Sequence, residues 1–205
     1  MRRIRRDAGF TLIELLITIV IMGVITIPLA NFVINYFVNT STTTGRLSES
    51  HDEQLAATYF ASDVASVGSR GGGTSLQQSI WPGSFPAGSC GSSASSANQV
   101  LLLTWDNITW TGSAETVRTD AVAYIKAVAS GETQLRRIYC QGTTQISNIV
   151  VVHNLDAATA PVVTCSSTCT AAAVPATVSL QLRIAEASGS GQPLTVTLTG
   201  QRRQT

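Results

Sequence analysis

Residues 1–30 read MRRIRRDAGFTLIELLITIVIMGVITIPLA, and this stretch decides the fold of the N-terminal part. Four arginines between residues 2 and 6 precede the run 10–30, in which Glu14 is the one charged residue. A helix rises about 1.5 Å per residue, so this run would be about 30 Å long, which matches the hydrocarbon core of a bilayer. Because basic residues favour the cytoplasmic side, we expect residues 10–30 to cross the cytoplasmic membrane once, with the N-terminus inside.

The composition agrees with a membrane-anchored domain outside the cytoplasm. The 205 residues are 44% hydrophobic and 12% charged, with a formal net charge of +1. This length is enough for one domain with an appendage. Residues 1–9 hold four of the thirteen basic residues, so the remainder carries nine basic and eleven acidic residues. A chain without a basic field is not typical of nucleic-acid-binding proteins.

Glu14 is the unusual residue of the apolar run. A carboxylate inside a membrane span costs about 2.5–3.5 kcal/mol on insertion scales. Two explanations remain open: either Glu14 lies near the interface or is protonated, or it has a cationic partner. The next basic residue along the chain is Arg46, so such a partner would come from another chain or from a newly made N-terminus.

The sequence GFTLIELL at residues 9–16 resembles the class III signal of type IV pilins and type II secretion pseudopilins. The basic leader 1–9, the glycine before the cut, the phenylalanine after it and the glutamate four residues later all match. The resemblance implies that prepilin peptidase cleaves between Gly9 and Phe10 and methylates the new amine of Phe10. Glu14 would then pair with the Phe10 amine of a neighbouring subunit during filament assembly, which supplies the missing cation.

One position departs from this pattern. Many members of the family carry a helix-kinking proline where this chain has Asn31, and the proline within the apolar run is Pro28. Proline removes a helical hydrogen bond, so we expect Pro28 to kink or loosen the helix about one turn earlier than usual.

Apolar residues continue at helical spacing beyond the membrane run, so we expect one long helix over residues 10–67. These residues are Leu47, Leu55, Tyr59, Phe60, Val64 and Val67. The acidic residues Glu49, Asp52, Glu53 and Asp63 are expected on other faces. The segment 41–45 contains β-branched residues and glycine, so it is a possible break in the helix. Glycines at 68 and 71–73 end the pattern.

A β-rich domain is expected over residues 68–205, with a long Gly-, Ser- and Pro-rich loop over 68–99. Alternating apolar residues predict antiparallel strands, and Asp106-Asn107 is predicted to be a turn. The predicted strands are 100–105, 108–110, 122–128, 135–140, 146–153, 178–184 and 194–198. The predicted fold is therefore α+β, a long N-terminal helix packed on an antiparallel sheet. The segment 122–137 also resembles the core hairpin of the J-type minor pseudopilins.

All four cysteines are expected on the outer side of the membrane, where disulfides form. They are Cys90, Cys140, Cys165 and Cys169, and three pairings are possible. The short spacing favours Cys165–Cys169, which leaves Cys90–Cys140. A zinc site or a redox pair would have C-x-x-C spacings, so neither a metal nor another cofactor is predicted.

No catalytic arrangement is predicted. His51 is expected on an exposed helix face, and His153 ends an apolar strand. The sequence contains no G-x-S-x-G motif and shows no Ser/His/Asp set, so we expect the protein not to be an enzyme. Three tryptophans remain open to two interpretations, as core residues or as an exposed aromatic surface for a ligand. They are Trp81, Trp105 and Trp110.

The resemblance implies a minor pilin or pseudopilin that waits in the cytoplasmic membrane and then joins or primes a helical filament at the cell surface. Its partners would be prepilin peptidase and other pilin subunits, which it would contact through the N-terminal helix. Glu14 argues against the role of a capping subunit, which often lacks this residue. The alternative is a filament-displayed adhesin or DNA receptor. The basic pair Arg202-Arg203 gives weak, salt-sensitive contact with DNA at most.

Overall fold

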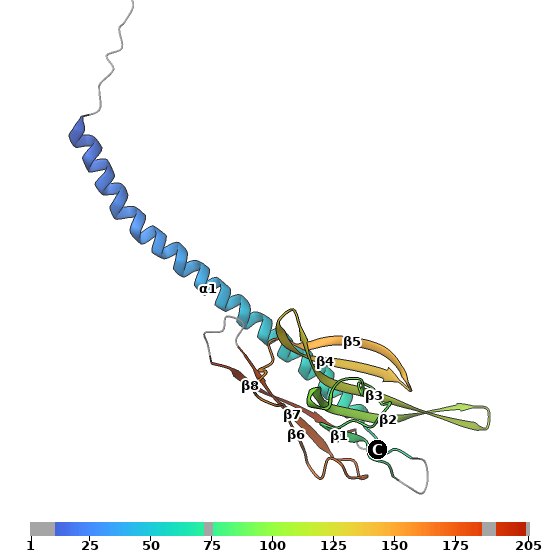
Figure 1. Cartoon of the computed structure of the whole chain (residues 1–205). Coiled ribbons are helices and arrows are strands. Elements are labelled where there is room, and N and C mark those ends of the chain that lie inside the picture. Colours follow the sequence, from blue (N-terminus) through green and yellow to red (C-terminus); the bar gives the residue numbers. More distant parts are fainter. Residues whose placement is uncertain (1–10, 72–75, 186–191, 204–205) are drawn as a thin grey trace, which may run out of the picture. The chain divides into compact units, whose positions relative to one another are not determined.

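The computed structural model describes residues 11–71, 76–185 and 192–203. Figure 1 shows a long helix followed by β-strands, so the predicted α+β class is confirmed. The chain divides into two compact units, residues 1–44 and 45–205. The second unit therefore begins within the helix, at Gly45. The elements are α1 (Leu12–Ser66), β1 (Ile80–Pro82), η1 (Ser96–Asn98), β2 (Gln99–Thr111), β3 (Ala114–Ala129), β4 (Glu132–Gln141), β5 (Thr144–Val152), β6 (Val162–Cys165), β7 (Thr177–Ile184) and β8 (Leu194–Gln201).

The helix α1 is continuous through both of its predicted weak points. The segment 41–45 lies inside it, so the possible break there is wrong. Thr43 and Thr44 satisfy their hydroxyls locally, since their Oγ1 atoms donate to the carbonyl oxygens of Asn39 and Thr40 at 2.8 and 2.9 Å. Pro28 also lies within the helix, and the local kink or loosening at this residue stays a prediction.

The strands of the second unit form two antiparallel sheets, ordered β1-β2-β3-β4-β5 and β6-β7-β8. The predicted turn at Asp106-Asn107 is wrong, because β2 runs through both residues and turns at Gly112 instead. Asp106 accepts hydrogen bonds from Thr119 Oγ1 and from the backbone N–H of Gly71, so cross-strand and loop contacts hold it in the strand. The predicted loop 68–99 contains the short strand β1, which pairs with β2.

The C-terminal half of α1 supplies one wall of the main core. Ala56, Phe60 and Val64 of the helix, together with Val67 directly after it, are buried there against residues from both sheets. Leu47 is 67% exposed, so the apolar stripe begins later than predicted. Gly200 allows β8 to lie close to α1, because a Cβ atom at this position would lie 2.5 Å from the Cβ of Val64.

The opposite face of the larger sheet carries a second, smaller core. Phe85 and Cys90 of the preceding loop pack there on Leu102, Ala123 and Ile138. The disulfide Cys90–Cys140, here called the long-loop disulfide, has a sequence separation of 50 and fastens this loop to β4. This disulfide holds the loop on the sheet at a place where the apolar core is small.

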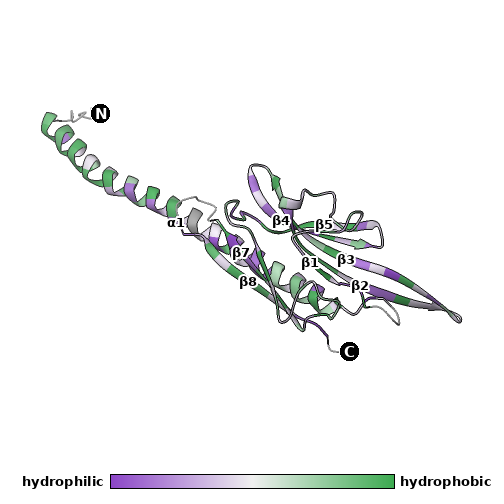
Figure 2. Cartoon of the chain, turned by 60° about the horizontal axis from the view of Figure 1, so that its bottom comes forward, coloured by the Kyte–Doolittle hydropathy of each residue, from purple (hydrophilic) through white to green (hydrophobic). Residues whose placement is uncertain are grey.

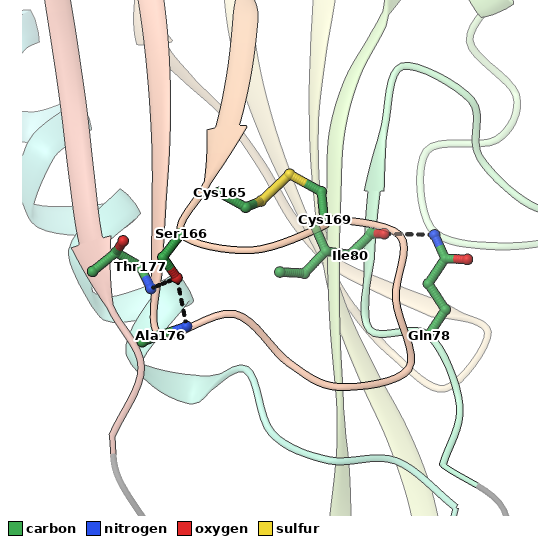
Figure 3. The surroundings of a disulfide bond; sticks show 7 residues. All are labelled: Gln78, Ile80, Cys165, Ser166, Cys169, Ala176 and Thr177. Carbon is green, nitrogen blue, oxygen red and sulfur yellow. Dashed lines mark hydrogen bonds between the residues drawn. A yellow bond between two sulfur atoms is a disulfide. The ribbon is translucent and has the colours of Figure 1, made fainter.

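The second disulfide, Cys165–Cys169, here called the short-loop disulfide, has a sequence separation of 4 and lies at the end of β6 (Figure 3). Both bonds follow the pairing that the sequence favoured. Between the two cysteines, Ser166 Oγ accepts hydrogen bonds from the backbone N–H groups of Ala176 and Thr177 at 3.0 and 3.1 Å. The small loop is therefore tied to the start of β7.

Candidate functional site

The most apolar part of α1 lies fully exposed in the isolated chain. Figure 2 shows the start of the helix coloured largely hydrophobic. Large hydrophobic side chains are exposed from Leu12, at 83%, to Val38, at 58%. By length and composition the helix can cross a membrane. Because exposed apolar surface is unfavourable in water, this part of the helix fits membrane anchoring.

Glu14 is exposed on this apolar surface, near the first turn of the helix. Its Oε2 atom accepts a hydrogen bond from the backbone N–H of Thr11 at 3.4 Å and one from Thr11 Oγ1 at 3.3 Å. The order Thr-x-x-Glu is that of a capping box, in which the glutamate reaches back to the N–H before the helix. The carboxylate therefore lies beside the start of the helix.

The other residues of the predicted processing site, Gly9 and Phe10, lie outside the described residues, as does the leader 1–9. Cleavage, methylation and the contact between Glu14 and Phe10 therefore stay predictions. Thr18 Oγ1 donates to the carbonyl oxygen of Glu14 at 2.6 Å, which satisfies this hydroxyl inside the helix. Among the described residues, the exposed carboxylate of Glu14 is the charged group at this end of the apolar surface.

A buried ion pair connects the second half of α1 to the large sheet. Asp63 accepts two hydrogen bonds from Arg137 of β4, at 2.6 and 2.7 Å, and one from the hydroxyl of Tyr124 of β3 at 2.6 Å. The side chains of Asp63 and Arg137 are 5% and 12% exposed. Arg137 also lies 4.8 Å from the ring centroid of Tyr59.

The protonation states in this network support each other. Burial raises the pKa of Tyr124 well above its ordinary value, and the Asp63 charge and hydrogen bond raise it further, so the phenol stays neutral and donates. Burial opposes the charge of Arg137, but hydrogen bonding to Asp63, the Asp63 charge and the contact with Tyr124 together outweigh it and raise the pKa of the guanidinium. The contact is therefore a charged pair with a neutral donor.

A second carboxylate on α1 also turns toward the sheet. Asp52 accepts a hydrogen bond from the backbone N–H of His153 and lies 2.8 Å from its Nδ1 atom. The expectation that Asp52 and Asp63 lie on other faces than the apolar stripe is wrong, because both are buried. Asp52 and Asp63 are 11 residues apart, which is about three helical turns, so they lie on the same side of the helix as Ala56 and Phe60. This spacing in the sequence could have predicted that both carboxylates are on the buried face. His51 is exposed, as expected.

A third buried carboxylate lies on the large sheet and was not assigned a role from sequence. Asp120 accepts hydrogen bonds from Arg118 at 2.7 and 3.0 Å and from Asn107 at 3.3 Å. Burial favours its neutral form, yet these hydrogen bonds and the Arg118 charge together lower the pKa of Asp120. Asp52, Asp63 and Asp120, the buried aspartates of the described residues, thus each have a hydrogen-bond partner within the chain. Among the described residues, no group of three or more His, Cys, Asp and Glu side chains is placed to hold a metal ion.

The tryptophans separate into two environments. Trp105 is partly buried and stacks on Tyr139 at a centroid distance of 6.3 Å, and Trp81 is partly buried beside Arg70. Trp110 is 67% exposed near the tip of the β2–β3 hairpin, so a core role for it is wrong. Ile108 and Val117 lie opposite each other in the same hairpin and are each 49% exposed.

Comparison with known proteins identifies one segment. A family model for the prokaryotic N-terminal methylation motif matches residues 4–30. The chain therefore carries the class III signal, the signature of type IV pilins and pseudopilins, and the motif supports a substrate of prepilin peptidase that assembles with other pilins. Proteins with this motif are structural subunits, and an apolar N-terminal helix fits membrane anchoring. No curated protein and no solved structure matches the chain.

Proposed function

We propose that the chain is a minor pilin or pseudopilin, a structural subunit without catalytic activity. It waits in the cytoplasmic membrane with the leader inside and residues 31–205 outside. Prepilin peptidase cuts between Gly9 and Phe10 and methylates the Phe10 amine. The mature helix then joins or primes a type IV pilus-like or type II secretion filament. The observation that carries this proposal is the exposed Glu14 carboxylate at the start of an apolar helix that matches the methylation motif.

The assembly step follows from the cost of an unpaired charge. Glu14 lies on a surface that is otherwise apolar, where an isolated carboxylate is unfavourable. Cleavage after Gly9 would create an amine four residues before Glu14. In a filament, this amine on a neighbouring subunit would neutralise the carboxylate and set the axial register. Removing one member of such a buried pair leaves the other charge uncompensated.

The first experiment is the intact mass of the full chain extracted from its native membrane. We expect a chain that begins at Phe10 and carries one additional methyl group. A chain that begins at Met1 would contradict the proposal, because Glu14 would then have no amine to meet. A Gly9→Val variant, which blocks the cleavage position, serves as the uncut control for the mass and for membrane insertion.

The second experiment tests Glu14 itself. Glu14→Gln keeps the size of the side chain but removes its charge, so we expect normal cleavage and reduced incorporation into filaments. Glu53→Gln is the matched control, because Glu53 is an exposed glutamate on the same helix in the second unit. Equal incorporation of both variants would show that the charge of Glu14 has no role in assembly.

A second candidate function is recognition of a surface ligand by a subunit displayed on the filament. The observation that favours it is the apolar face of the β2–β3 hairpin, formed by Ile108, Trp110 and Val117. Figure 1 shows this hairpin projecting beyond the other strands. Trp110→Ala should then abolish adhesion while filaments remain intact, and Thr109→Ala on the other face of β2 should not. Loss of filaments in the Trp110→Ala strain would assign the hairpin to assembly instead.

A further inference from the structure

The exposed apolar surface of α1 is longer than a membrane requires. Large exposed hydrophobic side chains run from Leu12 to Val38. At about 1.5 Å per residue this surface is about 40 Å long, whereas the hydrocarbon core of a bilayer is about 30 Å thick. Burying all of it in lipid would need a tilt of about 40°, the upper end of the range found for membrane helices. With a smaller tilt, residues 31–39 emerge from the hydrocarbon with their apolar side chains uncovered.

This emerging segment carries a regular row of amides. Asn31, Asn35 and Asn39 recur every four residues, so they lie along one ridge of the helix. All three side chains are exposed. The ridge continues through Ile27 on one side and Thr43 on the other, both of which are also exposed. We refer to residues 27, 31, 35, 39 and 43 as the Asn ridge.

A groove accompanies the Asn ridge. It is lined on one side by Asn35, Asn39 and Thr43 and on the other by the next ridge, which consists of Phe32, Tyr36, Thr40 and Thr44. Helices pack when the ridge of one enters the groove of another, and the four-residue rows are those that the commonest packing uses. The amides and the groove therefore present a surface suited to a second helix.

The chemistry of the Asn ridge favours an identical partner. Each amide offers one carbonyl acceptor and two N–H donors, so asparagine is complementary to asparagine. The proposed topology inserts every copy with its N-terminus inside, which makes the helices of two copies parallel. The three amides of one copy then lie at the same depth as the three amides of the other. A single buried asparagine already selects register and partner in parallel coiled coils.

We propose that α1 docks in parallel on α1 of a second copy of this chain, with the Asn ridge at the contact. The amides hydrogen-bond across the interface, and Phe32 and Tyr36 lose exposed apolar area beside them. The dimer covers one side of the apolar surface that a bilayer leaves in water, the side that carries Phe32 and Tyr36. This inference rests on the membrane topology of the proposed function and names a partner for the membrane-held state, but it does not require cleavage at Gly9.

The test is disulfide cross-linking of the full chain in membranes. All four native cysteines are paired, so one introduced cysteine reports its own neighbours. Asn39→Cys and Thr43→Cys place the thiol on the Asn ridge beside the groove, and Phe37→Cys places it about 120–160° around the helix from both. Mild oxidation should give several-fold more dimer for both ridge positions than for Phe37→Cys. Equal dimer at all three positions would overturn the proposal.

The amides are tested in the Thr43→Cys background, in which all three asparagines are present. Changing Asn31, Asn35 and Asn39 together to leucine should reduce the dimer several-fold, whereas changing them to glutamine, which retains the amide, should preserve most of it. An undiminished dimer in the leucine variant would overturn the role of the amides. Two differently tagged copies should appear in one product, and a product that contains a different protein would overturn the identical partner.

The outcome is separable from that of the proposed function. Cross-linking is repeated in the uncut Gly9→Val chain, where we expect the same dimer because the ridge lies beyond the leader. If intact mass shows no processing while the ridge dimer forms, the filament role fails and the dimer stands. If processing and incorporation are normal while the ridge positions give no more dimer than Phe37→Cys, the dimer fails alone.

Discussion

Replacing Asp63 with asparagine removes the charge that connects α1 to the large sheet and leaves the size of the side chain unchanged. Arg137 then remains with its side chain 12% exposed and without the carboxylate that it contacts at 2.6 and 2.7 Å. Breaking a buried pair by removing one partner costs about 3–5 kcal/mol, because the remaining charge is uncompensated. For a chain of this size, 1 kcal/mol corresponds to about 2–4 °C, so we expect the melting temperature to fall by about 6–20 °C.

The assay is thermal and urea unfolding of the full chain in detergent at neutral pH, followed by near-ultraviolet circular dichroism of the second unit, residues 45–205. Asp156→Asn is the matched control, because Asp156 pairs with Arg183 at 3.4 Å and the arginine is 46% exposed. Such an exposed pair contributes about 0–1 kcal/mol. If Asp63→Asn destabilises no more than Asp156→Asn, the buried pair does not hold the helix on the sheet.

A double substitution separates the charge from the packing. Replacing Asp63 with leucine and Arg137 with methionine removes both charges and keeps apolar volume in the same place. Buried ion pairs can often be replaced in this way with little loss of stability. We therefore expect the double variant to be more stable than Asp63→Asn. A double variant that is less stable than the single one would show that the geometry of the pair, rather than the uncompensated charge, determines the loss.

Three further predictions concern the second unit, residues 45–205. Gly200→Ala should cost about 1–3 kcal/mol in urea unfolding, since its Cβ would overlap α1, whereas Gly68→Ala, which has open space, should change stability by less than about 0.5 kcal/mol. Raising the pH above about 10 should destabilise the wild type, because Tyr124 ionises in the unfolded chain but stays neutral in the folded one; Tyr124→Phe should flatten this loss, and identical pH curves would contradict the assignment. Replacing both cysteines of a disulfide by alanine should lower the free energy of unfolding, because the unfolded chain gains loop entropy. The expected loss is about 4 kcal/mol for the long-loop disulfide and about 2 kcal/mol for the short-loop disulfide. The reverse order in denaturant unfolding would refute this account.

The N-terminal helix could be predicted from the sequence because its expected surroundings, the lipids of a bilayer, make no residue-specific contacts. A bilayer accepts any apolar helix of sufficient length, so the run 10–30 needs no specific partner to be recognised. The methylation motif adds residue types at fixed positions within the same short window. The strand pattern of β7 and β8 was equally local, since alternating residues in one hairpin predict which face is buried.

The polar contacts of the second unit could not be predicted from local sequence patterns, because they join residues that are distant in sequence. Asp63 meets Tyr124 and Arg137 across separations of 61 and 74 residues, and no local pattern shows which basic residue a carboxylate will reach. The extent of β2 failed for the same reason. Asp106 followed by asparagine has the composition of a turn, but Thr119 and Gly71, brought close by the sheet and by the end of α1, offer it hydrogen bonds within the strand.

The two halves of α1 therefore differ in how their partners are specified. In the second half, Asp52 and Asp63 lie on the buried face among apolar residues, and each has a partner within the chain. In the first half, Glu14 and the amides of the Asn ridge interrupt an exposed apolar surface. A polar group on a surface destined for burial is favourable only when a partner meets it. If the first half is buried by other subunits, those polar groups are the positions at which the partners must be complementary, and substitutions there should alter assembly without changing the stability of residues 45–205.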